Sequence, residues 1–180
     1  MGVAGIVSQD EAVNFLTDKV GGPYINRYIN HVSQSDIPSK APGAIVPDIH
    51  AWNYPTGSQR INDSGACITA EAIFEMKTMT ACNSRYNFTN NDRISPADRR
   101  ANAIRVEYKR KFRKLDQKFA QDFIGPRDSN GNFDGPFSLA QQRFFTKQII
   151  PCVTGWFGDL GTDYEKVIRT IAWQASGTID

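Results

Sequence analysis

The sequence predicts an α/β fold with a mixed central sheet flanked by helices. Two short apolar runs rich in Ile, Val and Ala follow one another in the first half of the chain, as buried strands do. A long stretch with apolar residues at intervals of three and four comes next and is typical of an amphipathic helix. Another apolar run and a helical segment with a capping pattern complete the order of elements.

Length and composition indicate a single domain that spans residues 1–180, since domains typically have about 100–200 residues. The hydrophobic content of 40% and the charged content of 22% are those of a globular protein. Three scattered cysteines form neither a disulfide framework nor a zinc pattern. No apolar run is long enough to cross a bilayer and no secretory signal is visible, so we expect an intracellular protein, cytoplasmic or nuclear, that is not secreted and binds no membrane.

The first segment, residues 8–32, is expected to form a broken helix or a helix pair. Ser8 with Glu11 matches a capping box, and apolar residues recur at helical spacing as far as Val20. Gly21-Gly22-Pro23 ends this helix, and a second helical pattern then continues to Val32.

Two strands are expected after a polar connection. The first is the apolar run 44–52, and a hairpin-type connection over 54–65 follows it. The second is residues 68–79, for which a helix over 69–79 is an alternative on propensity alone. We favour the strand because the motif described below requires it.

The long helix is expected to begin after Ser95, with Pro96 at its first position, and to run to Phe123. A polar loop over 83–93 precedes it, and Gly125-Pro126 ends it. Its apolar positions are Ala101, Ile104, Tyr108, Phe112, Leu115, Phe119 and Phe123.

Three elements are expected in the last third of the chain. A short helix over 138–147 begins at Ser138 with Gln141 as capping partner, and a strand covers 149–157. A last helix, capped by Thr162 with Glu165, continues to Ala175.

Acidic and basic residues occur in the two predicted strands of the first half. Asp48 lies in the first strand, and Glu75 and Lys77 lie in the second, where residues two positions apart share a face. Two carboxylates on neighbouring strands can bind a hard divalent cation, with the Met76 carbonyl as a further ligand. Such an ion polarises a phosphodiester and lowers the pKa of its water, while an ammonium nearby orients that water or neutralises charge. These residues therefore predict metal-assisted hydrolysis.

Pro47-Asp48 and Glu75-x-Lys77, each after an apolar run, resemble the PD-(D/E)xK nuclease superfamily. The resemblance implies a restriction-endonuclease-like αβββαβ core and hydrolysis of DNA or RNA with magnesium or manganese. It covers residues 8–157 in the order of elements. Gly155-Trp156-Phe157-Gly158 and its surroundings resemble nuclease-like segments of mobile elements. Asp48 and Glu75 are 27 positions apart, which requires an extended hairpin between them.

Three further residues stay open as parts of this site. Asp63, 12 positions before Glu75, is the rival of Asp48 for the first acid, although its surroundings resemble a turn. Glu11 matches the helical acid with which many superfamily members bind metal, or is a helix-capping residue. Gln141, or its neighbour Gln142, resembles the Gln of the Gln-x-x-x-aromatic motif in the RecB and phage-exonuclease branch, or Gln141 is the capping partner of Ser138.

Basic residues concentrate in the long helix. Between Arg99 and Lys118 nine basic residues accompany two acidic ones, so this segment carries +7 and the rest of the chain −5, although the formal net charge is only +2. On the solvent faces of a helix they can bind phosphates and gain from counterion release. The expected nucleic-acid-binding residues are Arg99, Arg100, Arg105, Lys109, Arg110, Lys111, Arg113 and Lys114. An ordinary solvated helix face is the alternative.

Three functions follow from these patterns. The first is a metal-dependent endonuclease or exonuclease acting on nucleic acid, with DNA favoured over RNA. The second is a nucleic-acid-binding module without activity, in which the basic helix 96–123 binds phosphates. The third is a structural domain whose long helix binds a partner protein.

Overall fold

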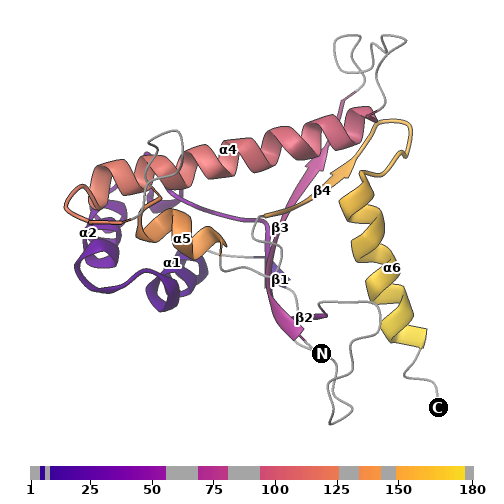
Figure 1. The fold of residues 1–180 in the computed structure, drawn as a ribbon. Helices are drawn as coiled ribbons and strands as arrows, with labels where there is room; N and C mark the ends of the chain where they lie inside the picture. Colours follow the sequence, from indigo (N-terminus) through magenta and orange to yellow (C-terminus); the bar gives the residue numbers. More distant parts are fainter. Residues whose placement is uncertain are drawn as a thin grey trace.

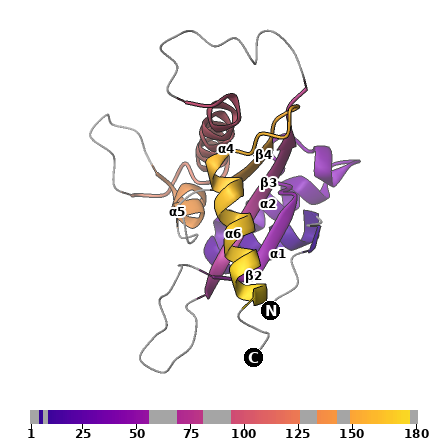
Figure 2. The same cartoon turned by 90° about the vertical axis from the view of Figure 1, so that its right-hand side faces the viewer.

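A small mixed sheet separates two groups of helices in the computed structural model (Figures 1 and 2). The structure describes residues 5–6, 9–55, 69–80, 94–125, 134–142 and 149–176. The strands lie in the order β1 (Gly5–Ile6), β2 (Ile49–Pro55), β3 (Thr69–Thr78) and β4 (Ile150–Thr154). β2 is antiparallel to β1 and β3, whereas β4 is parallel to β3. The predicted α/β fold with a mixed sheet flanked by helices is therefore confirmed.

The helices lie on both faces of this sheet. They are α1 (Gln9–Lys19), α2 (Gly22–Ser33), α4 (Pro96–Phe119), α5 (Pro136–Gln142) and α6 (Thr162–Ser176), with a short 3-10 turn, η1, at Pro38–Lys40. The predicted helix pair at the start is confirmed, and its two helices meet at Gly22, whose φ of +53° favours glycine. Within the described residues no helix is long and apolar enough to cross a membrane.

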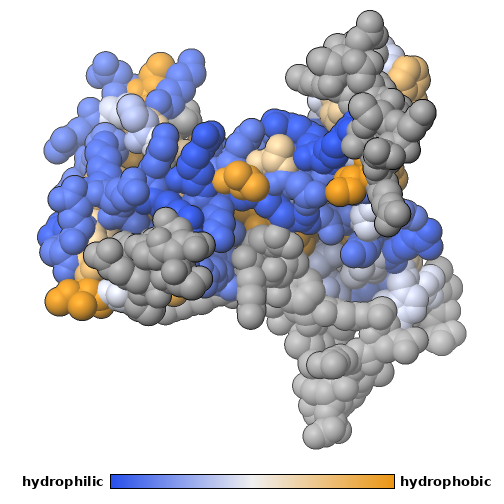
Figure 3. Space-filling view, turned by 45° about the horizontal axis from the view of Figure 1, so that its top comes forward, coloured by the Kyte–Doolittle hydropathy of each residue, from blue (hydrophilic) through white to orange (hydrophobic). Residues whose placement is uncertain are grey.

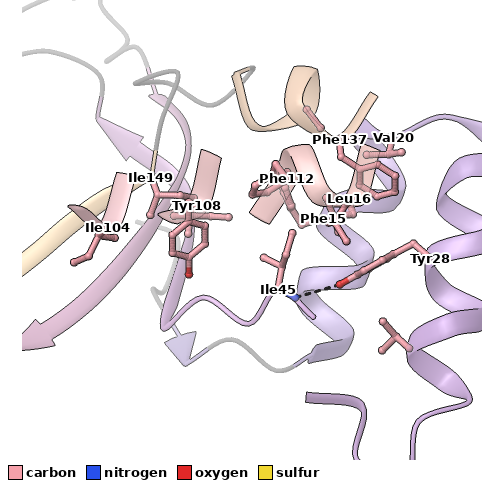
Figure 4. Packing of buried hydrophobic residues seen from close by; sticks show 14 of the residues in the cluster. Phe15, Leu16, Val20, Tyr28, Ile45, Ile104, Tyr108, Phe112, Phe137 and Ile149 are labelled. Atoms are coloured by element: carbon pink, nitrogen blue, oxygen red, sulfur yellow. Dashed lines mark hydrogen bonds between the residues drawn. The ribbon is translucent and has the colours of Figure 1, made fainter. Parts of the chain in front are cut away.

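Successive side chains of β3 point to opposite faces of the sheet, so the apolar core has two parts. Ile73 packs into the larger cluster, which contains residues of α1, α2, α4 and α5, and Phe74 packs into the smaller one beside α6. Figure 4 shows part of the larger cluster, in which the hydroxyl of Tyr28 accepts the N–H of Ile45 at 3.2 Å. Residues 73, 75 and 77 therefore face α4, whereas 74 and 76 face α6.

Strand β2 begins later than predicted, at Ile49 instead of position 44, and extends to Pro55. Asp48 therefore lies immediately before the strand and not within it. Pro47 has no N–H for a ladder hydrogen bond, which favours a start after this residue. β3 is a strand as predicted and not a helix, because it pairs with β2 on one side and with β4 on the other.

Helix α4 begins as predicted but ends earlier. Ser95 Oγ accepts the N–H of Asp98 at 3.0 Å, and Pro96 is the first helical residue. The helix ends at Phe119 instead of Phe123. Arg27 of α2 donates to the Phe119 carbonyl at 2.8 Å, so a residue from another helix binds one of the free carbonyls at this end.

The caps predicted for α5 and α6 are wrong, because carboxylates of α4 replace them. α5 begins at Pro136, and the Asp116 carboxylate accepts N–H groups of Gly135, Phe137 and Ser138 at 2.8–3.2 Å. Thr162 is the first residue of α6, and its N–H donates to Asp98 at 2.7 Å. Both acceptors come from distant parts of the sequence, which a local pattern does not reveal.

Strand β4 covers Ile150–Thr154 and stops before the predicted end at 157. The N–H of Gly155 donates to the Asp159 carbonyl at 2.7 Å and so closes a turn where the strand was expected to continue. The last helix reaches Ser176, one residue beyond the prediction. The predicted loop 83–93, most of the connection 54–65 and the second half of the helix 138–147 lie outside the described residues.

Candidate functional site

The structure brings Asp48, Glu75 and Lys77 together at the end of the β2–β3 pair. Lys77 Nζ lies 2.6 Å from Glu75 Oε1 and 3.8 Å from Asp48 Oδ2, so both carboxylates reach within about 4 Å of one point. The side chains of Asp48 and Lys77 are 42% and 39% exposed, whereas that of Glu75 is 10% exposed. The group is therefore anchored in the protein at Glu75 and open to solvent at the other two residues.

The pairing of β2 with β3 explains this meeting. Ile49 is opposite Phe74, so Asp48, which precedes the strand, lies beside the end of β3 that carries Glu75 and Lys77. The N–H of Met76 donates to Asp48 Oδ2 at 2.7 Å and holds the carboxylate at this edge. In an extended strand the N–H and the carbonyl of one residue point to the same edge, so the Met76 carbonyl also points toward the Asp48 side.

Tyr108 of α4 is a further member of the site. Its hydroxyl donates to Glu75 Oε2 at 2.5 Å, and both residues are buried. Burial raises the pKa of Tyr108 far above its ordinary value, and the hydrogen bond to Glu75 raises it further. The hydroxyl therefore stays protonated and keeps its role as donor to the carboxylate.

The sequence pattern places Tyr108 only in the apolar stripe of the long helix. A signal was present, because a tyrosine in a buried stripe needs a partner for its hydroxyl. Which residue supplies that partner depends on how α4 packs across β3.

Lys77 is held as an ammonium ion. Its hydrogen bond to Glu75 raises its pKa and outweighs the desolvation that lowers it, and the charge of Asp48 adds to the increase. The charge of Arg100 in α4 acts in the opposite direction on the same pKa, so this guanidinium is close enough to influence the group.

The donor set fits a hard divalent cation. Asp48 and Glu75 supply carboxylate oxygens and Met76 supplies a carbonyl directed to the same edge, and Mg²⁺ commonly binds to proteins through one or two carboxylates while it keeps several waters. No cluster of three or more His, Cys, Asp or Glu side chains suited to a metal occurs in the described parts of the chain. Any ion here would thus rely on two carboxylates, with water completing its coordination.

The other candidate ligands do not join this group. Gln141 is buried in α5, which packs against α4 and α1, and among the described residues no hydrogen bond links it to Asp48, Glu75 or Lys77. Glu11 lies in the first turn of α1, but its side chain is outside the described part of the structure, as is all of Asp63.

The basic residues of α4 differ in what they bind. Arg105 forms an ion pair with Asp163 of α6, and Arg113 forms one with Asp134 before α5 at 3.4 Å. Both pairs are partly buried and join α4 to its neighbours, so we assign these two arginines a structural role. Arg99, in the first turn of α4, is partly buried.

The remaining predicted bases lie along the solvent side of α4, over which Figure 3 shows mainly hydrophilic side chains. Lys109, Arg110, Lys111 and Lys114 are exposed, whereas Arg100 is partly buried and pairs with Glu107 at 3.2 Å.

One flank of α4 opens on the candidate site. Arg100, Lys111, Lys114 and Lys118 lie on this flank together with Glu107, since residues 3, 4, 7 or 11 positions apart share one side of a helix. Lys111 Nζ is 4.9 Å from the centre of the Tyr108 ring, and Arg100 acts on the pKa of Lys77. This flank therefore continues a positively charged surface from the site along the helix.

No protein-family model matches the chain, and comparisons with curated proteins and with solved structures found no match either.

Proposed function

We propose that this protein is a metal-dependent nuclease that hydrolyses phosphodiester bonds at Asp48, Glu75 and Lys77. The observation that carries the proposal is the meeting of two carboxylates and an ammonium at the end of two paired strands, at distances of 2.6 and 3.8 Å. This set of groups fits phosphodiester hydrolysis, since carboxylates bind the metal and cations neutralise the phosphate.

Asp48 and Glu75, with the carbonyl of Met76, would hold Mg²⁺ or Mn²⁺. When bound, such an ion supplies polarisation of the phosphodiester and a water of lowered pKa. Lys77 is protonated and exposed enough to hold a water or a phosphate oxygen by hydrogen bonding. Tyr108 fixes the orientation of Glu75 through its short hydrogen bond and so acts as a positioning residue.

The basic flank of α4 supports nucleic acid as the substrate. Lys111 and Lys114 are exposed and lie one turn apart on the flank of α4 that opens on the site, whereas Arg100 on the same flank pairs with Glu107 and acts on the pKa of Lys77. Cations in such a row bind successive phosphates without reading the base sequence. Arg105 and Arg113 leave the predicted set, because their guanidinium groups already bind Asp163 and Asp134.

A restriction-endonuclease-like core belongs to this proposal, with one difference in topology. α1, the β2–β3 pair, α4 and the parallel strand β4 follow the order that the resemblance implies. That core has three consecutive strands before the long helix, whereas the described residues contain two there, and the additional strand β1 precedes α1.

Cleavage of labelled single- and double-stranded DNA and of RNA, with Mg²⁺ or Mn²⁺ and with chelator, tests the proposal. Asp48→Asn and Glu75→Gln should each reduce metal-dependent cleavage at least 100-fold, in line with the loss of a group that stabilises transition-state charge. Calorimetry should show weaker binding of Mn²⁺ by the same variants.

Glu71→Gln is the matched control. Glu71 lies on the same strand and the same face as Glu75, and it pairs with Lys19 at 3.6 Å away from the site. This variant should cleave like the wild type. Equal cleavage by wild type, Asp48→Asn and Glu75→Gln would assign the activity to a contaminant and reject the proposal.

The second candidate is a nucleic-acid-binding module without catalysis. The observation that favours it is the position of Lys77 Nζ between the two carboxylates, where it already neutralises part of their charge. Nucleic-acid binding without cleavage under any metal condition, and without measurable Mn²⁺ binding, would select this function.

A further inference from the structure

The turn between β4 and α6 presents two aromatic side chains to solvent. Trp156 is 60% exposed and Phe157 is 76% exposed, which is unusual for adjacent large aromatic residues. Neither residue belongs to the two apolar clusters of the core.

The backbone of this turn is firmly held. The N–H of Gly155 donates to the Asp159 carbonyl at 2.7 Å, the N–H of Gly158 donates to the Gly155 carbonyl at 3.2 Å, and Thr154 pairs with Leu160 below them. A Cβ at Gly155 would overlap the Asp159 carboxylate, and Gly158 has a φ of +82°. The two rings are therefore carried on a fixed support, which lowers the entropic cost of binding through them.

The position of the turn relates it to the candidate site. β3 and β4 are parallel with Lys77 opposite Val153 and Thr78 opposite Thr154, so the turn starts at the end of the sheet that follows Lys77. Strand spacing and rise place the Cα atoms of Trp156 and Lys77 within about 15 Å of each other. Figure 1 shows this turn beside the start of α4, where Arg99 and Arg100 lie.

We propose that Trp156 and Phe157 stack on unpaired bases, so that the substrate of this site is single-stranded nucleic acid or a frayed end. The inference rests on the proposed function and adds the class of substrate. Phosphate-binding cations next to exposed rings are the combination by which single strands are bound. A nucleic acid contacts both the rings and the positive charge of α4, whereas an apolar protein partner contacts the rings alone. In an intact duplex the faces of the bases are covered by stacking, so only unpaired bases offer a free face to the rings.

The test measures binding in chelator, where cleavage does not interfere. Labelled oligothymidylate and a duplex of the same length are titrated with wild type, Trp156→Ala/Phe157→Ala and Trp173→Ala. Trp173 is the matched control, because it is 51% exposed and lies on α6 away from the turn. The double variant should bind the single strand about tenfold or more weakly, and the duplex within about twofold of wild type. The control should bind both like the wild type.

Tryptophan emission gives a second readout that does not need the alanine variant to fold. Oligothymidylate should quench the emission of wild type and should protect it from acrylamide, and both effects should be lost in Trp156→Phe. Unchanged quenching in this variant would overturn the inference, and so would equal loss of single-strand and duplex binding in the double variant.

Two outcomes separate this inference from the proposed function. Metal-dependent cleavage with no role of the turn in single-strand binding would overturn the inference and leave the nuclease. Turn-dependent binding without cleavage would support the inference and reject the nuclease. Binding to phosphatidylserine vesicles that depends on the rings, with oligonucleotide binding unchanged, would assign the turn to a membrane surface and overturn the inference.

Discussion

Glu75 illustrates how a buried carboxylate finds partners for both of its oxygens in this protein. Burying an ionised group is costly unless it is paired and hydrogen-bonded, and Glu75 receives the Tyr108 hydroxyl on one oxygen and the Lys77 ammonium on the other. Both oxygens thus already have strong donors. The Lys77 ammonium lies between the two carboxylates that would hold a metal, so it and the ion compete for the same negative charge.

This competition leads to a prediction for Lys77→Met. Removing the ammonium should strengthen the binding of Mn²⁺ by about tenfold, because a like charge at close range is lost. Cleavage should fall at the same time, because the group that holds the water or phosphate oxygen is missing. Calorimetric titration with Mn²⁺ and the cleavage assay measure the two effects on the same samples.

Lys19→Met is the control for this variant. Lys19 pairs with Glu71 on β3, as Lys77 pairs with Glu75, but away from Asp48. Its removal should change neither metal binding nor cleavage. Weaker metal binding by Lys77→Met would show that the lysine supports the ion instead of competing with it, and the assignment of the site would have to change.

At the scale of single residues the sequence predicted the acid–Lys pair and the first acid but not their surroundings. Glu75 and Lys77 were predicted because a strand places alternate residues on one face, and β3 is a strand. Asp48 was expected inside a strand and lies just before one. It still contacts β3, through the N–H of Met76 and the ammonium of Lys77. Tyr108 was missed, since its partner is 33 positions away in the sequence.

At the scale of elements, the starts of α4 and α6 depend on one carboxylate. The Asp98 carboxylate accepts the N–H of Thr162 at 2.7 Å and the Thr162 hydroxyl at 3.0 Å. It also accepts the hydroxyl of Ser95 at 2.9 Å. One side chain therefore replaces a cap for α6 and joins this helix to α4 at the end of the sheet near Lys77.

We predict that Asp98→Ala lowers the free energy of unfolding by about 1–2 kcal/mol at neutral pH, as the loss of a cap does. Burial raises the pKa of Asp98, but the hydrogen bonds from Thr162 and Ser95 and the charge of Arg105 outweigh it, so the pKa is below its ordinary value. A depressed pKa means that the stabilisation is complete above the unfolded value of about 3.9 and is lost as the pH falls through the folded value.

Urea unfolding of wild type and Asp98→Ala from pH 7 down to pH 2 measures this dependence. The difference between them should persist to below pH 4 and diminish as the pH falls further. Asp36→Ala, a change at an exposed residue, should show no difference at either pH. A difference that stays constant over the whole range would refute the role of the charged form of Asp98.

The elements themselves followed from periodicity, but their ends did not. Apolar spacing located α4 to within a few residues, because burial imposes the helical period. An apolar run located β3, but its assignment as a strand depended on the acid–Lys motif, since propensity alone also allowed a helix. α5, α6 and the end of α4 are set by Asp116, Asp98 and Arg27, which come from other elements. Side chains that cap from a distance leave no local pattern in the sequence.

At the scale of the whole molecule, the segregation of charge survives folding in part. α4 contributes most of the positive charge, but Arg105 and Arg113 form ion pairs with Asp163 and Asp134. The cations that remain available lie on the solvent side and on the flank beside Glu75. A nucleic acid bound there should depend on these residues and not on the total charge of the helix.

The last prediction concerns the salt dependence of binding to single-stranded DNA. Lys111→Gln/Lys114→Gln should reduce the slope of log affinity against log salt concentration by about 1.4, since each contact with a phosphate contributes about 0.7 for single strands. Lys40→Gln/Lys166→Gln removes the same charge from exposed residues of η1 and α6, away from this flank, and should leave the slope nearly unchanged. Fluorescence anisotropy in chelator at 50–300 mM salt measures both. Equal reductions by the two variants would mean that only net charge attracts the nucleic acid, and the flank of α4 would lose its role as the binding surface.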